Sequence, residues 1–230
     1  KNKNFNPNIT KSFYLTRHKL LKNIAENAKY LNGKMMDLGC GSKPYKALIH
    51  VDEYIGVDFH GEGHSHENEN IDFFYDGKTI PFENNTFDSI LSTEVFEHVF
   101  NLPELLSEIN RVLKSDGILL ITCPFIIAEH EVPNDFARYT SFGIKHLLND
   151  AGFEIIKYKK IGTSFESVMQ VFMSYLDSYV ISKLNFFKPL KWIFGTFIIL
   201  FANIATIIIN EILPKRQDAF LNHIIVCKKK

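Results

Sequence analysis

The sequence predicts an α/β fold in which helices cover a doubly wound, mostly parallel sheet. Three observations support this. A short apolar run ends in an acid, Asp37, and then breaks into a turn at Gly39 and Gly41. A second short run ends at Asp58, about 20 residues later, which is the spacing of a strand–turn–helix–strand unit. Further along, residues 118–123 are continuously apolar, as expected for a buried parallel strand.

Length and composition predict one domain without a strongly charged surface. The chain has 230 residues, 46% of them hydrophobic and 23% charged, and its formal net charge is zero. A neutral chain argues against nucleic acid as a partner. The three cysteines lie far apart, so neither disulfides nor a structural zinc site are expected, and a reducing cytosol fits. Residues 1–10 hold no apolar run, so no signal peptide is expected.

The other elements follow from apolar periodicity and from turn residues. Helices are predicted from Thr10 or Ser12 to about Tyr30, giving an N-terminal helical cap over residues 1–33, and then over residues 44–50, 102–113 and 142–151. Additional strands are predicted over residues 71–76, 87–92, 153–161 and 220–227.

The two-glycine turn predicts a nucleotide-type pocket. Glycines allow close approach of a ligand to the backbone, and a following helix beginning near Pro44 would point free N–H groups at it. A dinucleotide fold needs a third glycine where Pro44 stands, so a pyrophosphate ligand and an NAD-linked oxidoreductase are less favoured.

The motif over residues 37–42, Asp-Leu-Gly-Cys-Gly-Ser, resembles the first motif of class I S-adenosylmethionine (SAM) dependent methyltransferases. The resemblance implies a Rossmann-like sheet of seven strands whose last strand is antiparallel. It also implies that SAM is the cofactor. Asp58 is placed to accept hydrogen bonds from ribose hydroxyls, although a plain turn aspartate is the alternative. Asp76, with Asp72 as the fallback, would accept from the adenine amino group. The full set of predicted cofactor-binding residues is Asp37, Gly39, Cys40, Gly41, Asp58, Asp76, Thr93 and Glu94.

Two histidines are candidate catalytic bases. His98 lies four residues after Glu94, so the two would share a helix face if this turn is helical. His130 lies in a polar loop over residues 125–140. The alternative for each is a structural histidine or an internally paired loop. A second histidine-rich stretch, with His60, His64 and His66, is interpreted as a solvated loop, and no metal site is predicted.

The same loop is the predicted substrate contact. Its sequence contains a histidine followed by Pro-x-Asp and then Arg-Tyr-Thr, and this pattern is similar to one in small methyltransferases of surface-polysaccharide gene clusters. The resemblance implies that Asp135, Arg138 and Tyr139 contact the substrate. Arg138 can hold an anionic group in forked geometry. The alternative is an internal salt bridge between Asp135 and Arg138.

An apolar insertion over residues 162–217 separates the last two strands. Residues 192–210 carry no formal charge, and the length of this segment is near that needed to span a bilayer. A single crossing would leave the last strand on the wrong side of the membrane. Three interpretations therefore stay open: a buried helix covering the sheet or pocket, a helix in the membrane interface flanked by basic residues, or a homodimer contact.

Together these features predict methyl transfer from SAM to a sugar hydroxyl of a surface glycan or its lipid-linked precursor, in the cytoplasm and at the inner face of the cell membrane. A quinone-type or other small apolar acceptor is the alternative. A third possibility is a non-catalytic interaction protein with the SAM-binding fold. A measurement of SAM binding distinguishes it from the enzymes, because only the enzymes need to bind SAM.

Overall fold

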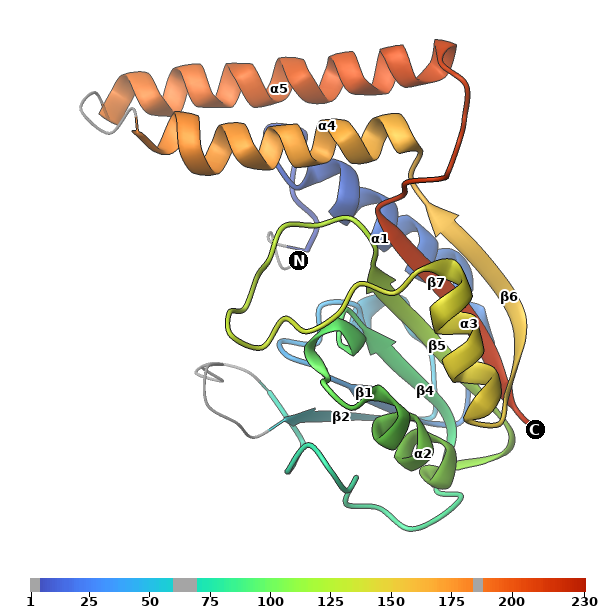
Figure 1. The fold of residues 1–230 in the computed structure, drawn as a ribbon. Helices are drawn as coiled ribbons and strands as arrows, with labels where there is room; N and C mark the ends of the chain where they lie inside the picture. Colours follow the sequence, from blue (N-terminus) through green and yellow to red (C-terminus); the bar gives the residue numbers. More distant parts are fainter. Residues whose placement is uncertain (1–4, 60–69, 184–187) are drawn as a thin grey trace. The chain divides into compact units, whose positions relative to one another are not determined.

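The computed structural model describes residues 5–59, 70–183 and 188–230, and it divides into two compact units (Figure 1). The sheet unit contains Asn23–Phe125, Glu129–Lys159 and His223–Lys230. The helical unit contains Lys1–Lys22, Ile126–Ala128 and Lys160–Asn222. The predicted insertion and the first part of the predicted cap, to Lys22, lie together in the helical unit, whereas the rest of the cap, from Asn23 to Gly33, belongs to the sheet unit. That both are parts of a single domain stays a prediction.

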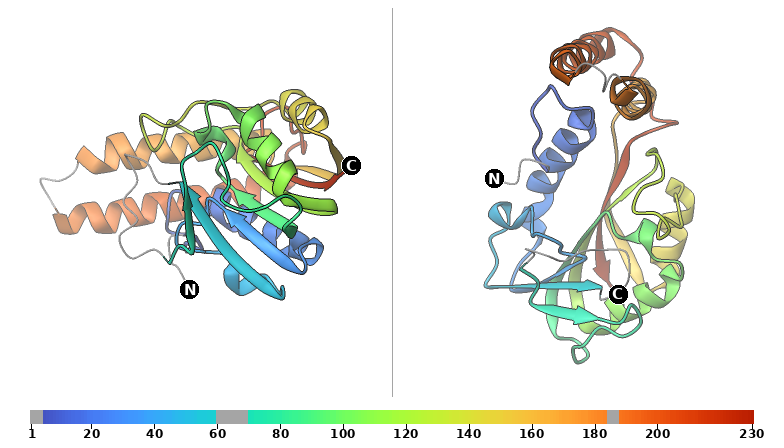
Figure 2. Two further views of the ribbon diagram at one scale, coloured as in Figure 1. Left: turned by 90° about the horizontal axis from the view of Figure 1, so that it is seen from below. Right: turned by 90° about the vertical axis from the view of Figure 1, so that its left-hand side faces the viewer.

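The predicted sheet is confirmed. Its seven strands have the order β3-β2-β1-β4-β5-β7-β6, with parallel pairing from β3 to β5 and an antiparallel β7 (Figures 1 and 2). The order reverses beside β1, the switch point at which open α/β sheets bind ligands. The strands are β1 (Lys34–Leu38), β2 (Glu53–Phe59), β3 (Phe73–Tyr75), β4 (Phe87–Thr93), β5 (Leu113–Pro124), β6 (Phe153–Ile161) and β7 (Asn222–Lys229).

Helices cover the sheet because each buries one apolar stripe. In α2 (Leu102–Val112) that stripe consists of Leu102, Leu105, Leu106, Ile109 and Val112. The helix α3 (Ser141–Asp150) lies on the same face of the sheet as α2 (Figure 2), and it begins where Thr140 Oγ1 accepts from the Gly143 amide. The end of α1 (Tyr14–Asn27) and the 3₁₀ turn η1 (Ala28–Tyr30) lie on the opposite face.

Two local expectations are wrong. No α-helix follows the glycine turn, because residues 44–50 form only a 3₁₀ turn, η2 (Lys46–Leu48). Seven residues make a helix too short to be stable by itself, and here Tyr45 is drawn into the core instead. The second difference concerns the strand predicted over residues 118–123. That strand already begins at Leu113, and its pairing with β4 is interrupted by a register shift where Asp116 has a φ of +63°.

The helical unit is built around a pair of long helices that lie side by side (Figures 1 and 2). They are α4 (Ser164–Tyr175), continued by the π-helical turn η4 (Leu176–Val180), and α5 (Lys188–Ile212). Thr163 and Glu166 form a capping box at the start of α4. Buried Leu15, Met173, Ile181 and Ile199 form the apolar cluster of this unit.

The helix α5 has its polar residues on the inside. Buried Asn203 donates to the Ile9 and Lys11 carbonyl oxygens, and buried Asn210 accepts from the Thr163 hydroxyl. Its exposed face is apolar, with Phe201 74% and Ile212 81% exposed. Residues 193–212 are long and apolar enough to cross a membrane, and only 28% of their most apolar stretch is buried. The interpretation of this segment as a buried helix is therefore wrong.

Candidate functional site

The glycine turn after β1 has the backbone that its glycines permit. Gly39 and Gly41 have φ values of +72° and +44°. A Cβ atom on Gly39 would lie 2.2 Å from Val95 Cγ2, so this position has room only for glycine. The turn amides are already bonded: those of Gly39 and Cys40 donate to the Val57 carbonyl oxygen, and that of Gly41 donates to Asp58 Oδ2 at 2.6 Å. The expectation of free turn amides is therefore wrong for this structure.

Asp37 is a buried carboxyl group beneath this turn. The Tyr54 hydroxyl donates to its Oδ2, and its Oδ1 has no hydrogen-bond partner among the described residues. Burial raises the pKa of Asp37 to about 7, and the nearby Asp58 adds to the rise. Burial likewise raises the pKa of the Cys40 thiol above its usual range. The sequence did not single out Tyr54, because nothing local shows that the strand register brings it to Asp37.

The other predicted cofactor acids lie near the ends of β2 and β3. Asp58, near the end of β2, accepts from the Gly41 and Phe59 amides. Asp76 follows β3, is exposed, and accepts from the Lys78 and Thr79 amides at 2.9 Å each, which lowers its pKa. The fallback, Asp72, is held by Lys43 Nζ and the Gly56 amide, each at 2.6 Å. Their roles toward a cofactor stay predictions.

The residues after β4 are arranged differently from the expectation. Thr93 ends the strand opposite Thr122 of β5. Glu94 has a φ of +55°, and the helical turn η3 (Phe96–His98) begins only after it. The prediction that Glu94 and His98 share a helix face is therefore wrong. Glu94 instead accepts from the Thr122 hydroxyl at 2.8 Å.

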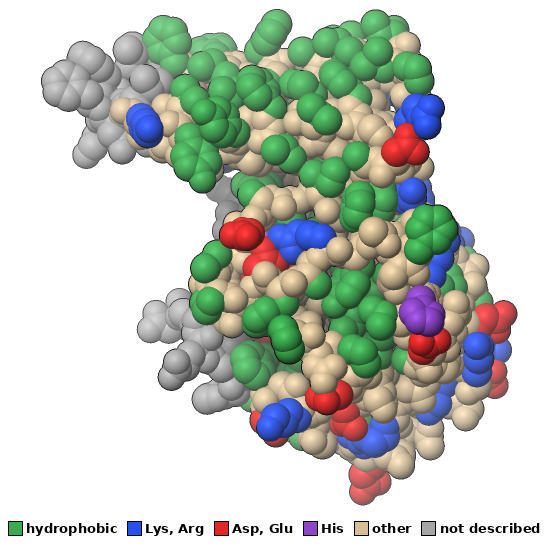
Figure 3. All heavy atoms as spheres, in the orientation of Figure 1, with side chains coloured by type: hydrophobic (Ala, Val, Ile, Leu, Met, Phe, Trp, Pro, Cys, Tyr) green, Lys and Arg blue, Asp and Glu red, His purple; other side chains and the backbone are tan. Residues whose placement is uncertain are grey.

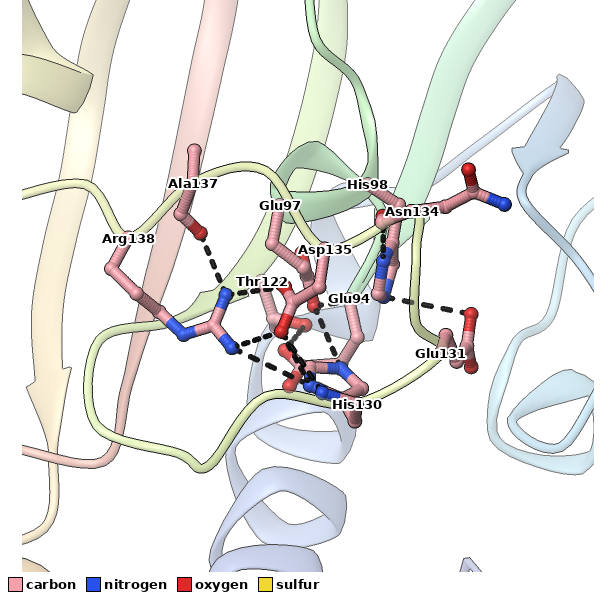
Figure 4. Close-up of polar contacts among 10 residues, drawn as sticks. All are labelled: Glu94, Glu97, His98, Thr122, His130, Glu131, Asn134, Asp135, Ala137 and Arg138. Atoms are coloured by element: carbon pink, nitrogen blue, oxygen red, sulfur yellow. Dashed lines mark hydrogen bonds and ion pairs between the residues drawn. The ribbon is translucent and has the colours of Figure 1, made fainter.

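His98 and His130 come together around Glu97 (Figure 4). Glu97 Oε1 lies 3.7 Å from His98 Nε2 and 3.9 Å from His130 Nε2. The two imidazole rings meet edge to face, with centroids 4.8 Å apart. The Glu97 side chain is 1% exposed, and neither of its carboxylate oxygens has a hydrogen-bond partner among the described residues. Burial raises its pKa well above the usual range, and Glu94 adds to the rise.

The loop that carries His130 is hydrogen-bonded to the backbone of Glu97. The amides of Phe136 and Ala137 both donate to the Glu97 carbonyl oxygen. Arg138 donates two hydrogen bonds of 2.6 Å to the Asp135 carboxylate (Figure 4), and this guanidinium lowers the pKa of Asp135 to about 2. The internal salt bridge weighed as an alternative is thus present. Substrate contact by these residues stays a prediction.

Tyr139 follows Arg138 and is held at its backbone. Its carbonyl oxygen accepts from His223 Nε2 at 2.8 Å, and its half-buried ring packs against the core of the sheet unit. Burial raises the pKa of its phenol to about 12. The histidine-rich stretch with His60, His64 and His66 lies outside the described residues.

The site therefore holds two groups of polar residues at the carboxyl ends of β1, β2, β4 and β5. The first, around Asp37 and Asp58, offers carboxylates to a ligand at the glycine turn. The second, around Glu97, offers two imidazoles that can accept or release protons. The sequence predicted both histidines, but not the buried carboxylate between them.

Comparisons with known proteins bear on this arrangement. Residues 36–121 match a protein-family model described as a methyltransferase domain. The chain is similar to "Arginine-hydroxylase NDUFAF5, mitochondrial" of Homo sapiens, with 30% identity over 145 residues that cover 53% of this chain and 42% of that protein. It is also similar to demethylmenaquinone methyltransferase of Staphylococcus saprophyticus, with 32% identity over 99 residues that cover 38% of this chain and 42% of that protein. The chain spans about two fifths of the length of these relatives.

A solved structure shows the same fold. It is phosphoethanolamine N-methyltransferase 2 of Haemonchus contortus in complex with SAM, with a TM-score of 0.54 and 15% identity. The match covers 98% of this chain and 59% of that chain.

Proposed function

Because this chain belongs to the class I SAM-dependent methyltransferases, we propose that it transfers the methyl group of SAM to a sugar hydroxyl of a surface glycan or of its lipid-linked precursor. In this reaction the bond between the methyl carbon and the sulfonium breaks, and a carbon–oxygen bond forms. The hydroxyl proton passes to a base, and S-adenosylhomocysteine leaves. Alignment of the two reacting centres supplies much of the rate.

The observation that carries the proposal is the pair of polar groups at the ends of the central strands. Asp58 lies near the end of β2 and Asp76 follows β3, where ribose and adenine would donate hydrogen bonds to them. Asp37 has one oxygen without a partner among the described residues, which suits the amino-acid end of SAM. A nitrogen or sulfur acceptor needs less help with its proton than a hydroxyl does, so the imidazoles of His98 and His130 favour a hydroxyl.

The helix α5 supports an acceptor that is carried on a lipid. A soluble surface helix turns its apolar residues inward, whereas α5 buries hydrogen-bonded Asn203 and Asn210 and exposes Phe197, Phe201 and Ile208. Figure 3 shows hydrophobic side chains spread over α4 and α5. In the sequence, Lys183, Lys188 and Lys191 precede this face and Lys215 and Arg216 follow it. Such a face flanked by basic residues fits the interface of an anionic membrane, at the cytoplasmic side.

The membrane proposal is tested by sedimentation with vesicles of phosphatidylglycerol and, separately, of phosphatidylcholine. The chain is expected to sediment with the anionic vesicles. The double variant Phe201→Asn/Ile208→Asn is expected to stay in the supernatant, whereas Phe142→Asn, at an 85% exposed position on α3, is expected to sediment as before. Equal recovery of all three proteins with the vesicles would contradict the proposal. Sedimentation velocity without lipid would show whether the same face instead forms a homodimer.

A quinone-type acceptor is the second candidate. It is favoured by the similarity to demethylmenaquinone methyltransferase and by an apolar groove of about 480 Å³ along α4 and α5, lined by Phe172, Leu176, Phe197 and Phe201 among others.

The activity is tested first by calorimetric titration with SAM and then by transfer of a labelled methyl group. Tight binding that falls at least about tenfold in Asp58→Ala supports the cofactor site, because a carboxylate that bonds to the ligand typically contributes more than 1 kcal/mol. Label in a lipid-linked glycan supports the proposed acceptor, and label in a demethylated quinone supports the second candidate. A chain that does not bind SAM would instead be a non-catalytic interaction protein.

A further inference from the structure

We propose that Glu97, His98 and His130 bind one divalent transition-metal ion at the carboxyl ends of β4 and β5. One ligand atom from each residue lies within 4.8 Å of the others (Figure 4). The proposal concerns metal binding and is independent of the methyl-transfer reaction.

A contact of His98 Nδ1 fixes which nitrogen of that imidazole presents a lone pair to the cluster. His98 Nδ1 lies 2.8 Å from the Asn134 carbonyl oxygen, which can only accept, so Nδ1 carries the proton and Nε2 presents a lone pair. His130 Nδ1 lies 3.3 Å from Asp135 Oδ2, which accepts, and 3.5 Å from Arg138 Nη2, which donates, so these contacts do not assign its proton. Histidines that bind metals typically donate their other N–H to a carbonyl or carboxylate, as His98 does.

The Nε2 atoms of both histidines face the side-chain carboxyl group of Glu97. Glu97 Oε1 lies 3.7 and 3.9 Å from them, and neither Glu97 oxygen has a hydrogen-bond partner among the described residues. A metal ion would replace the proton that the raised pKa of Glu97 favours, because a cation beside a buried carboxyl group stabilises its ionised form. An ion there would also give the Glu97 oxygens the partner that they lack among the described residues.

The surrounding charge also favours a cation. Glu94, Glu97, Glu131 and Asp135 are four carboxylates grouped around the cluster, and Arg138 is the guanidinium that pairs with Asp135. With neutral imidazoles and Glu97 protonated, as its raised pKa favours, the other three carboxylates and Arg138 still give a net charge of about −2. The Glu131 carboxylate lies 3.6 Å from His98 Nε2 and can serve as a further oxygen ligand.

The ligand set indicates the class of metal. Two imidazoles and one or two carboxylates suit Zn²⁺, Fe²⁺ or Co²⁺ and suit Ca²⁺ and Mg²⁺ poorly. Metal–ligand bonds of about 2.1 Å in tetrahedral geometry place ligand atoms about 3.4 Å apart. The two distances to Glu97 Oε1, 3.7 and 3.9 Å, need shifts of a few tenths of an ångström, and the remaining pair, which lies within 4.8 Å, closes by up to about 1.4 Å. The side chains of His98 and His130 are 16% and 30% exposed, so a coordination position is open to solvent or substrate.

If the proposed methyl transfer is correct, an ion here would hold the acceptor hydroxyl oxygen and lower the pKa of that hydroxyl, whose proton would leave to solvent. In that case His98 and His130 act as metal ligands and not as bases. This consequence rests on the proposed function.

The test uses the full chain without a polyhistidine tag, titrated with Co²⁺ and followed by the visible absorption of the bound ion. One equivalent is expected to bind, with displacement by Zn²⁺ and a rise in the thermal unfolding midpoint. His130→Ala and Glu97→Gln are expected to weaken binding at least about a hundredfold. Asp135→Asn, which removes the acceptor behind His130, is expected to weaken it about 10- to 100-fold.

Two controls address other binding sites. His146→Ala removes an exposed histidine that pairs with Asp150 on α3 and is expected to bind Co²⁺ like the parent chain. The triple variant His60→Ala/His64→Ala/His66→Ala is also expected to bind Co²⁺ like the parent chain. If Glu97→Gln fails to fold, His130→Ala still decides, because that side chain is on a loop and 30% exposed. Absence of Co²⁺ binding to the parent chain, or full binding to His130→Ala, overturns the proposal and leaves His98 and His130 as candidate bases.

Discussion

Replacing Asp37 with asparagine changes how stability depends on pH. Folding raises the pKa of this carboxyl from 3.8 to about 7. The folded state therefore binds the proton more tightly than the unfolded state does, and this contribution to stability is full below about pH 4 and is lost as pH rises toward 7. Each pKa unit corresponds to about 1.4 kcal/mol, so the loss amounts to about 4 kcal/mol. The amide introduced by Asp37→Asn has no such proton to release, and its oxygen can still accept from the Tyr54 hydroxyl.

The assay is urea unfolding of both proteins at intervals from about pH 4 to about pH 8, which brackets the two pKa values. The free energy of unfolding of Asp37→Asn minus that of the parent chain is expected to rise by about 4 kcal/mol across this range. Because other titrating groups are common to both proteins, they cancel in the difference. Asp116→Asn, at a 79% exposed carboxylate, reports the effect of removing one surface charge. A difference that varies by less than about 1 kcal/mol would refute the reasoning.

Three further predictions concern stability, each measured by urea unfolding. Gly39→Ala is expected to lose about 2–4 kcal/mol, because its φ is +72° and the new methyl group meets Val95; Val95→Ala should restore part of that loss, and a purely additive double variant would contradict the proposed contact. Thr163→Ala removes a cap and a buried bond to α5, so it should cost about 2 kcal/mol, against about 1 kcal/mol for the exposed cap Thr140→Ala; equal losses would speak against the buried bond. Arg138→Lys removes a forked pair and is expected to lose about 1–3 kcal/mol; an unchanged midpoint would show that the fork contributes nothing.

Much of the fold was predictable because apolar periodicity and turn residues are local signals. The continuous apolar run of β5 and the apolar stripe of α2 predicted those elements, and the resemblance of the motif over residues 37–42 implied the seven-stranded sheet. The helix expected after Pro44 failed because the run is short and a tertiary contact, the burial of Tyr45, decided its conformation. The shared helix face of Glu94 and His98 failed because Glu94 adopts a left-handed backbone conformation that no sequence period reveals.

The candidate site was predictable only in part, for a related reason. Motif order identified Asp58 and His98, but the groups that complete the site come from distant positions. The residue that fixes the ring of His98 is Asn134, 36 positions later, and the partner of Asp37 is Tyr54 on the neighbouring strand. Glu97 carries no local sign that it is buried, since an acid beside a histidine is usually solvated.

The insertion between β6 and β7 begins and ends at one place. The Leu221 amide donates to the Ile161 carbonyl oxygen at 2.8 Å, so the strands meet where the added helices depart and return. A tight hairpin turn can close the same gap without moving either strand. If α5 binds a membrane as proposed, membrane contact and chemistry on the sheet are encoded in stretches that can be excised or transplanted separately. The same helical pair, joined between the corresponding strands of another protein, should then bring that protein to a membrane.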